Sequence, residues 1–288
     1  MNRFSKLHPL AQFIFFMLTF FLVLCINNPF FSALCLLCAV LYRTKIKSDT
    51  LLKSIGMAVV LILTTAVFNM LFVHYGETVF FEIRALPCTA ESFLYGANQG
   101  AMLSAVILWF VSFGEIFDSE GILYLFRFTP KIALIFSMVL GFIPRFNKKI
   151  IQIREAKRAL NGGVYDASAK ERMKEALSNF SALITYSLES SIITAQSMNA
   201  RKYNPKAISP GRFRYTFSDI AALVLLIVLC TVIVYEKAIG HIQFTFNPKI
   251  SSTQFSPAGI ICFAILQLFP LILDLWEDMQ WKLSNAKN

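Results

Sequence analysis

Long apolar runs separated by short polar breaks dominate the chain. Several runs reach the roughly 20 residues that a helix needs to cross the hydrocarbon core of a bilayer. The alternation of apolar and polar positions typical of barrel strands is absent, so the pattern predicts an all-α, polytopic helical bundle. The predicted spans, about six in number, are Leu10–Ile26, Phe30–Tyr42, Leu51–Val73, Ser92–Phe113, Phe217–Tyr235 and Pro257–Leu275.

Between the fourth and fifth predicted spans the pattern becomes amphipathic. It predicts two long helices within residues 128–205, with apolar positions of the second helix recurring every three or four residues. From Ala176 to Ala200 the only charged residue is Glu189, so this apolar stripe needs a covering surface. The stripe consists of Met173, Leu177, Phe180, Ile184, Leu188, Ile192, Ala195 and Met198.

The first of these two helices begins with an apolar piece, Ile132–Ile143. This piece is too short to cross a bilayer and has Pro144 at its end. We therefore expect a buried or interfacial helix there, broken at the proline. Gly162 and Gly163 predict the end of the first long helix, and Pro205 predicts the end of the second.

Small and basic residues cluster where each long helix is expected to end. Arg158 and Arg201 are predicted to lie in the last turns, where the helix dipole favours a cation. An arginine fork pairs well with carboxylates, and neighbouring alanines allow close approach of a partner. By spacing alone, the interpretation of the arginines as markers of the membrane surface is the better of the two. The two clusters are Ala156, Arg158 and Ala159, and Ala200, Arg201 and Lys202.

The fourth predicted span and the loop before it carry further local signals. Gly96 and Gly100 have the spacing that lets two membrane helices approach closely. Asn98 and Gln99 lie in the same span, where we expect hydrogen bonds to a neighbouring helix or to a partner subunit. The segment Thr78–Ile83 is rich in strand formers and predicts a small hairpin.

Composition and charge support a membrane protein and set its orientation. The 288 residues are 56% hydrophobic and only 15% charged, whereas soluble domains carry about 25% charge. Of the 27 Lys and Arg, 16 lie between residues 114 and 216, together with 8 of the 17 Asp and Glu. Such a concentration marks the cytoplasmic side, so the net charge of +10 is a topology signal rather than a sign of nucleic-acid binding.

This bias predicts three segments with both termini in the cytoplasm. Residues 1–113 hold four spans, residues 114–216 form a cytoplasmic platform of two long helices, and residues 217–288 hold the last two spans and a tail. Arg3 and Lys6 precede the first span without a small-residue cleavage site, so this span is expected to be retained. Lys237 and Lys249 are the exceptions, since they fall in an outer loop.

Cysteine and histidine give no support for a metal or redox centre. Cys35 and Cys38 form a CxxC pattern inside an apolar run, with no second pair to complete a site. The three histidines lie far apart in sequence. We therefore expect neither a bound metal nor a cofactor.

From Ser92 onward the chain resembles the transmembrane (T) component of energy-coupling factor transporters. These transporters are vitamin and metal importers of the ATP-binding-cassette class. In this family, paired Ala-Arg-Gly motifs on coupling helices dock into grooves of two ATPase subunits. The likeness rests on the segments TAESFLYGANQ, LGFIPRFNKKI with Pro144, EAKRALNGG and AQSMNARKYNP.

The resemblance assigns the docking motifs residue by residue. In the second motif Ala200 and Arg201 agree, whereas Lys202 stands where the family has glycine. In the first motif Ala159 agrees, but Leu160 and Asn161 replace arginine and glycine. Arg158 could then act as the arginine of the first motif only if the motif is shifted in position along the chain.

The resemblance implies a non-catalytic subunit in a bacterial or archaeal cell membrane. Its implied partners are two ATPases, a small substrate-binding membrane subunit and the lipid bilayer. The apolar surface between Ile132 and Leu188, with the Phe-rich early spans, is the candidate surface for gripping that subunit. The chain lacks a GxxxxGK[ST] loop, so ATP is expected to be hydrolysed by the partners.

Two other classes compete with this interpretation. A conventional permease subunit would form its own pathway, and Arg154-Glu155-Ala156 followed by Gly162 faintly resembles the coupling loop of such a subunit. It would need polar residues lining several spans, of which only Asn98 and Gln99 are prominent. A membrane enzyme would need ionisable residues clustered at one depth, and such residues are scarce in the predicted spans.

Overall fold

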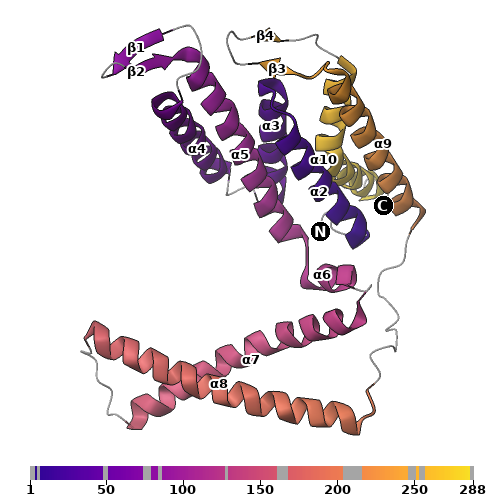
Figure 1. Cartoon of the computed structure of the whole chain (residues 1–288). Coiled ribbons are helices and arrows are strands. Elements are labelled where there is room, and N and C mark those ends of the chain that lie inside the picture. The colour runs from indigo at the N-terminus through magenta and orange to yellow at the C-terminus, as the bar shows by residue number, and fades with distance from the viewer. Residues whose placement is uncertain are drawn as a thin grey trace. The chain divides into compact units, whose positions relative to one another are not determined.

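The computed structural model of the chain is built almost entirely of helices (Figure 1). Within the described residues there are nine helices, α2 to α10, and two short hairpins. The chain divides into two compact units, residues 1–121 with 213–288, and residues 122–212. The structure describes residues 4, 7–47, 51–73, 79–83, 86–126, 129–160, 168–203, 216–245, 251–252 and 257–285.

The first unit is a bundle of apolar helices. Prolines begin α2 and α3, where the missing N–H would have no partner in any case. The side chains of His8 and Asn28 accept the N–H groups of Leu10 and Phe30 and so cap these helices. The bundle consists of α2 (Pro9–Cys25), α3 (Pro29–Ile46), α4 (Leu51–Phe72), α5 (Ala90–Ile116), α9 (Phe217–Ile239) and α10 (Pro257–Asn285).

Five helices of this unit are long and apolar enough to cross a membrane. Among the described residues these are α3, α4, α5, α9 and the part of α10 from Pro257 to Trp276. The predicted multi-pass bundle is thus confirmed for five candidate spans. The first predicted span, Leu10–Ile26, corresponds to α2, which is equally apolar but only 17 residues long.

An aromatic cluster forms the core of the bundle. The indole of Trp109 on α5 lies 5.5 Å from the Phe15 ring of α2 and stacks on Tyr42 of α3 at 5.6 Å. Phe4, which precedes α2, is fully buried against the same rings, 5.4 Å from Phe15. Cys35 and Cys38 are both free thiols buried in this core, so the CxxC pattern contributes to packing.

Helices α4 and α5 pack closely through small residues, as the sequence predicted. A Cβ atom at Gly96 would lie 2.8 Å from the Ala66 Cα of α4. One at Gly100 would lie 2.7 Å from the Ile62 Cα and closer still to the Thr65 hydroxyl. The backbones therefore approach to a distance that only glycine permits. The remaining faces of α4 expose large apolar side chains, as expected of a helix in contact with lipid.

Polar contacts tie the bundle together at one of its ends. Here the Phe4 N–H donates to the Asp274 carboxylate of α10 at 3.0 Å, and the His8 N–H donates to the Asp219 carboxylate of α9 at 3.1 Å. At the last turns of α3 and α5, Arg43 forms an ion pair with Glu115 at 2.5 Å. Because the Phe4 ring also lies 6.3 Å from the Tyr42 ring of α3, the starts of α2 and α9 lie beside the ends of α3, α5 and α10.

A second set of contacts marks the opposite end. The Asn28 amide donates to the Ile242 carbonyl at 3.2 Å, and the Lys237 ammonium donates to the Cys25 carbonyl at 2.6 Å. Cys25 ends α2, so Lys237 satisfies one of its last carbonyls. This contact gives the lysine a structural role at the end predicted to face outside. Successive helices thus alternate between the two ends, as a multi-pass topology requires.

Two small antiparallel hairpins complete the first unit (Figure 1). Strand β1 (Val79–Ile83) pairs with β2 (Leu86–Thr89), which confirms the hairpin predicted from Thr78–Ile83. Strands β3 (Phe244–Thr245) and β4 (Ser251–Ser252) form a second pair that the sequence pattern did not predict.

The second unit consists mainly of two long helices, α7 (Pro130–Leu160) and α8 (Ala169–Ala200). The boundary between the two units along the sequence falls within the short α6 (Ser119–Leu125). The predicted break at Pro144 is wrong, because α7 continues through it. A proline removes one backbone hydrogen bond, but the apolar stripe continues across it, and the Phe142 and Phe146 rings stack at 5.6 Å.

Candidate functional site

Helices α7 and α8, with the two residues that follow α8, carry every residue that the sequence predicted for ATPase docking. The two helices form an X in Figure 1. The Lys157 ammonium near the end of α7 donates to the Ser178 hydroxyl of α8 at 2.6 Å. Further back along α7, the Phe146 ring lies 6.4 Å from the Tyr186 ring, which is further on in α8. The helices therefore run antiparallel across each other, with their C-terminal ends pointing in opposite directions.

A cation–π contact strengthens the crossing. The Lys149 ammonium lies 4.7 Å from the centre of the Tyr186 ring, a geometry that contributes roughly 0.5–1 kcal/mol at an exposed site. With the Lys157 hydrogen bond and the Phe146 ring, it fixes the point where the helices meet.

Helix α8 has well-defined ends. It begins with a capping box, in which the Ser168 N–H donates to the Glu171 carboxylate at 2.8 Å and the Glu171 N–H donates back to the Ser168 hydroxyl. It ends at Ala200, so Arg201 is the C-cap residue and lies just beyond the last turn predicted for it. The sequence analysis expected the helix to run on to the stop at Asn204-Pro205 and to include Arg201 in its last turn, so it placed the helix end too late.

Arg158 and Arg201 are both exposed and lie far apart. Arg158 falls in the last turn of α7, as predicted. Arg201 lies 23 residues beyond Ser178, the α8 residue that meets the end of α7. At 1.5 Å per residue this is roughly 35 Å of helix. The pair thus presents two separate basic tips.

Small exposed residues accompany both arginines. Ala156 and Ala159 flank Arg158, and Ala200 precedes Arg201, all with exposed side chains. Gly162, Gly163 and Pro205, predicted to end the helices, lie outside the described residues, although α7 ends at Leu160, shortly before the glycines. Lys202, next to Arg201, is exposed and has a positive φ of 50°. The sequence analysis did not predict this conformation, because glycine is the usual signal for it.

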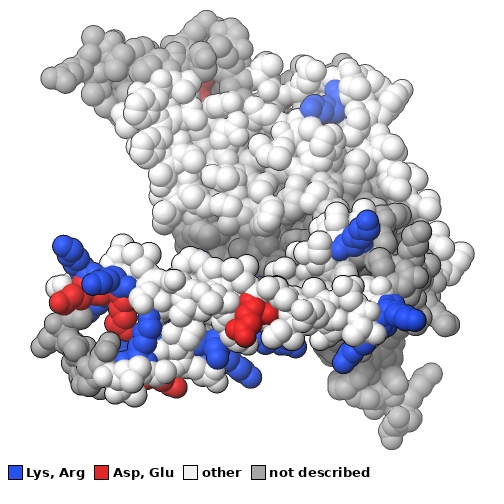
Figure 2. Space-filling model, turned by 60° about the horizontal axis from the view of Figure 1, so that its bottom comes forward, with Lys and Arg blue, Asp and Glu red and all other residues white. Residues whose placement is uncertain are grey.

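The apolar stripe of α8 is exposed from Met173 to Ala195, and Met198 is partly buried. Leu177 and Leu188 each expose 62% of their surface, and Ile192 exposes 60%. The residues that face α7, such as Asn179 and Tyr186, belong to a different and more polar side of α8. In Figure 2 an uncharged band with one small acidic patch runs along this unit between charged groups at its ends. The stripe predicted to need a cover is therefore left open by α7.

The polar residues predicted within the fourth span have partners inside the chain. Asn98 accepts the Ser32 hydroxyl of α3 at 2.5 Å and donates to the Asn27 side chain at 2.6 Å. Gln99 donates to the Tyr95 hydroxyl on its own helix at 3.0 Å. Asn98 is buried, so it joins neighbouring helices rather than lining an open pathway.

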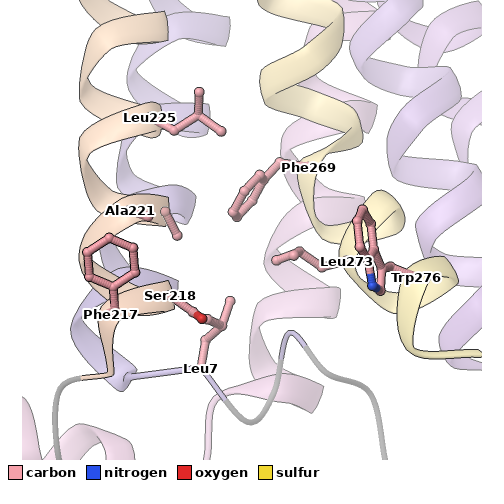
Figure 3. Close-up of a pocket in the computed structure, with 9 residues that line it drawn as sticks. Leu7, Phe217, Ser218, Ala221, Leu225, Phe269, Leu273 and Trp276 are labelled. Carbon is pink, nitrogen blue, oxygen red and sulfur yellow. The ribbon is translucent and has the colours of Figure 1, made fainter. Parts of the chain in front are cut away.

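An apolar cavity of about 410 Å³ lies between α9 and α10 (Figure 3). Leu225 and Ala221 line it from α9, and Phe269 and Leu273 from α10. Ser218 contributes the only hydroxyl group among the lining residues, and none of these residues is charged. The lining therefore suits hydrocarbon and offers no set of polar groups for recognising a polar substrate. Among the described residues, no group of three His, Cys, Asp or Glu is placed to hold a metal ion.

The helix lengths and apolar surfaces define the class of this protein. Its five candidate spans make it a multi-pass membrane protein in contact with the lipid bilayer. A comparison with protein-family models and with curated proteins finds no match to the chain.

Proposed function

We propose that the chain is the transmembrane coupling component of an energy-coupling factor importer of the ATP-binding-cassette class. In this role it transmits motion from two ATPase subunits to a separate substrate-binding membrane subunit that takes up a vitamin or a metal ion. The crossed pair α7 and α8 is the observation that carries the proposal. It combines two basic tips, roughly 35 Å apart along α8, with an apolar stripe that α7 leaves open.

The two features match the two partners that a coupling component needs. Arg158 and Arg201 offer planar guanidinium forks to carboxylates of the ATPases. The stripe from Met173 to Ile192 offers an apolar surface to the substrate-binding subunit, since an open stripe of this length is a typical docking surface. Because the crossing holds the helices together, movement of the ATPases at the tips reaches the stripe without any reaction on this chain.

The resemblance from Ser92 onward adds support from the sequence, above all Ala200 and Arg201 in the second motif. The chain has no catalytic role in this proposal, and ATP is hydrolysed by the partners. The cell membrane of a bacterium or archaeon, with both termini and the α7–α8 unit in the cytoplasm, is the corresponding location. Asn98 gives no support to the alternative of a conventional permease, because its side chain forms hydrogen bonds within the helix bundle.

The first test is purification of the tagged chain from the membranes of its own host in mild detergent, with mass spectrometry of the proteins that accompany it. We expect two ATPase chains and a small, very apolar membrane subunit, whose bound ligand would identify the cargo. An ATPase without a third membrane protein would favour the conventional permease. Recovery of the chain without any ATPase would refute the proposal.

The second test reverses the charge at one tip. In Arg201→Glu a carboxylate would face the carboxylates expected on the ATPase, and like charges placed together cost several kcal/mol. We expect membrane insertion to be retained and ATPase to be lost from the purified complex, with transport uncoupled. Lys170→Glu is the matched control, because it makes the same charge change at an exposed position at the other end of α8. Wild-type recovery of ATPase and wild-type transport by Arg201→Glu would contradict the role of this tip.

A further inference from the structure

Lys202 occupies a backbone conformation that lysine adopts at a cost. Among the described residues it is the one non-glycine residue with a positive φ, at 50°. In this left-handed region Cβ crowds the following carbonyl, which costs roughly 1–2 kcal/mol for a residue other than glycine. A lysine here therefore needs an explanation beyond its fit to the turn.

The turn itself is a complete Schellman motif. The Tyr203 N–H donates to the Met198 carbonyl, and the Lys202 N–H donates to the Asn199 carbonyl, both at 3.0 Å. Lys202 is thus the residue after the C-cap, the position that glycine usually fills. The geometry of the α8 end demands the positive φ, whichever residue stands there.

The same chain builds the same turn with glycine elsewhere. At the end of α9, the His241 N–H donates to the Glu236 carbonyl and the Gly240 N–H donates to the Lys237 carbonyl. Gly240 has a φ of 93° and fills the position that Lys202 fills at the end of α8. The two helix ends share one hydrogen-bond pattern, so the lysine is specific to the α8 tip and not to the turn.

Structural reasons for a cation at this tip are weak. A cation near a helix C-terminus contributes about 0.3–1 kcal/mol through the dipole, which is less than the backbone cost, and Arg201 already supplies one. Within the described part of the chain neither Arg201 nor Lys202 forms an ion pair. Both side chains are exposed. The ammonium group of Lys202 is therefore free to meet a partner.

We infer that Lys202 is a second docking cation, retained in a strained backbone position for contact with an acidic side chain of the ATPase. This inference rests on the proposed coupling function and deepens it. Arg201 supplies a planar fork, whereas Lys202 supplies a compact charge with three rotatable donors on a flexible stem. A tip with two adjacent cations grips an acidic surface more strongly than the single arginine of an Ala-Arg-Gly motif.

Three substitutions separate the charge from the strain. Lys202→Gly removes both, Lys202→Asn removes the charge with a residue that tolerates a positive φ, and Lys202→Arg keeps both. The probe is the ATPase that co-purifies with the wild-type chain, titrated against each full-length variant in detergent at low salt. The midpoint of unfolding of each variant is measured in parallel.

We expect Lys202→Gly and Lys202→Asn to bind the ATPase several-fold to roughly tenfold more weakly, and Lys202→Arg to bind as the wild type does. Lys202→Gly should nonetheless unfold at a higher midpoint, because the strain is relieved. Wild-type affinity of Lys202→Gly would overturn the inference, whatever its stability. If Arg201→Glu also kept wild-type affinity, the proposed function would fall as well, so the two failures are distinguishable.

Discussion

The close contact of α4 and α5 makes a quantitative prediction about Gly96. In Gly96→Ala the new Cβ would lie 2.6 Å from the Asn69 Cβ, 2.8 Å from the Ala66 Cα and 2.8 Å from the Thr65 carbonyl oxygen. Two of these three atoms belong to the backbone of α4, which cannot rotate away as a side chain can. We expect α4 to move away from α5 along this contact.

Two opposing effects set the size of the change. Replacing glycine with alanine inside a helix stabilises it by about 0.8–1.0 kcal/mol when nothing else changes. Overpacking of a closely packed interior costs typically about 1–3 kcal/mol, and a clash with backbone belongs in the upper part of this range. The net effect of Gly96→Ala should be a loss of about 1–2 kcal/mol in the free energy of unfolding.

The chain supplies a matched control in the same helix. Gly114 also lies in α5, but nothing is within 4 Å of a Cβ built there. Gly114→Ala should therefore show only the stabilising effect. Unfolding of both variants is followed by far-UV circular dichroism as a denaturing detergent is titrated into a mild one. If Gly96→Ala proved as stable as Gly114→Ala, the proposed backbone contact would be refuted.

Three further predictions concern polar groups of the bundle. Asn98→Leu removes the donor to the Asn27 side chain and one of the two acceptors of the Ser32 hydroxyl, which keeps only the Pro29 carbonyl. This should cost about 1–3 kcal/mol in the same titration; Gln99→Leu, whose partner is on its own helix, should cost less. Lys237→Met keeps the apolar stem but removes the donor to the last carbonyl of α2, so a loss of about 1 kcal/mol is expected, which Lys237→Arg should largely avoid. Burial lowers the pKa of His8 below its ordinary value of 6.5, although a nearby carboxylate opposes the shift. As the pH falls below about 6.5 the unfolded chain takes up a proton that the folded chain resists, so stability falls; His8→Asn keeps a capping acceptor and should remove this part of the pH dependence.

Each of these has a result that would contradict it. Equal stability of Asn98→Leu and Gln99→Leu would mean that the hydrogen bond between Ser32 of α3 and Asn98 of α5 contributes nothing to stability. A Lys237→Met variant as stable as the wild type would show that the hydrogen bond from Lys237 to the Cys25 carbonyl does not contribute to stability. For His8, the contradiction would be an unchanged loss of stability between pH 7 and pH 5 in His8→Asn.

The spans could be predicted because hydropathy sums over many residues, whereas their ends depend on distant partners. The predicted second span stopped at Tyr42, before the charge of Arg43. Helix α3 continues to Ile46 because Glu115, 72 positions later in the chain, pairs with this arginine. No local pattern contains that information.

The candidate site was predictable in its residue types and less so in its geometry. The stripe of α8 was evident from its period, yet which face of α8 would meet α7 depends on Tyr186 and Lys149, whose contact is formed only in three dimensions. Pro144 was a misleading signal, since the local cost of a proline was weighed without the aromatic contact that spans it. The left-handed turn at Lys202 was not predicted, because the glycine that usually marks such a turn is missing.

The links between the two ends of the chain have a consequence for the order of synthesis. The backbone N–H groups of Phe4 and His8 donate to side chains of α10 and α9, more than 200 positions later in the chain. The carbonyl at the end of α2 likewise accepts its hydrogen bond from Lys237. While a ribosome is still making the middle of the protein, these early groups have no native partner. Contacts of such long sequence separation form slowly. The α7–α8 unit is complete by residue 212, before α9 and α10 of the bundle are made. It can therefore fold while the bundle still lacks its last two helices.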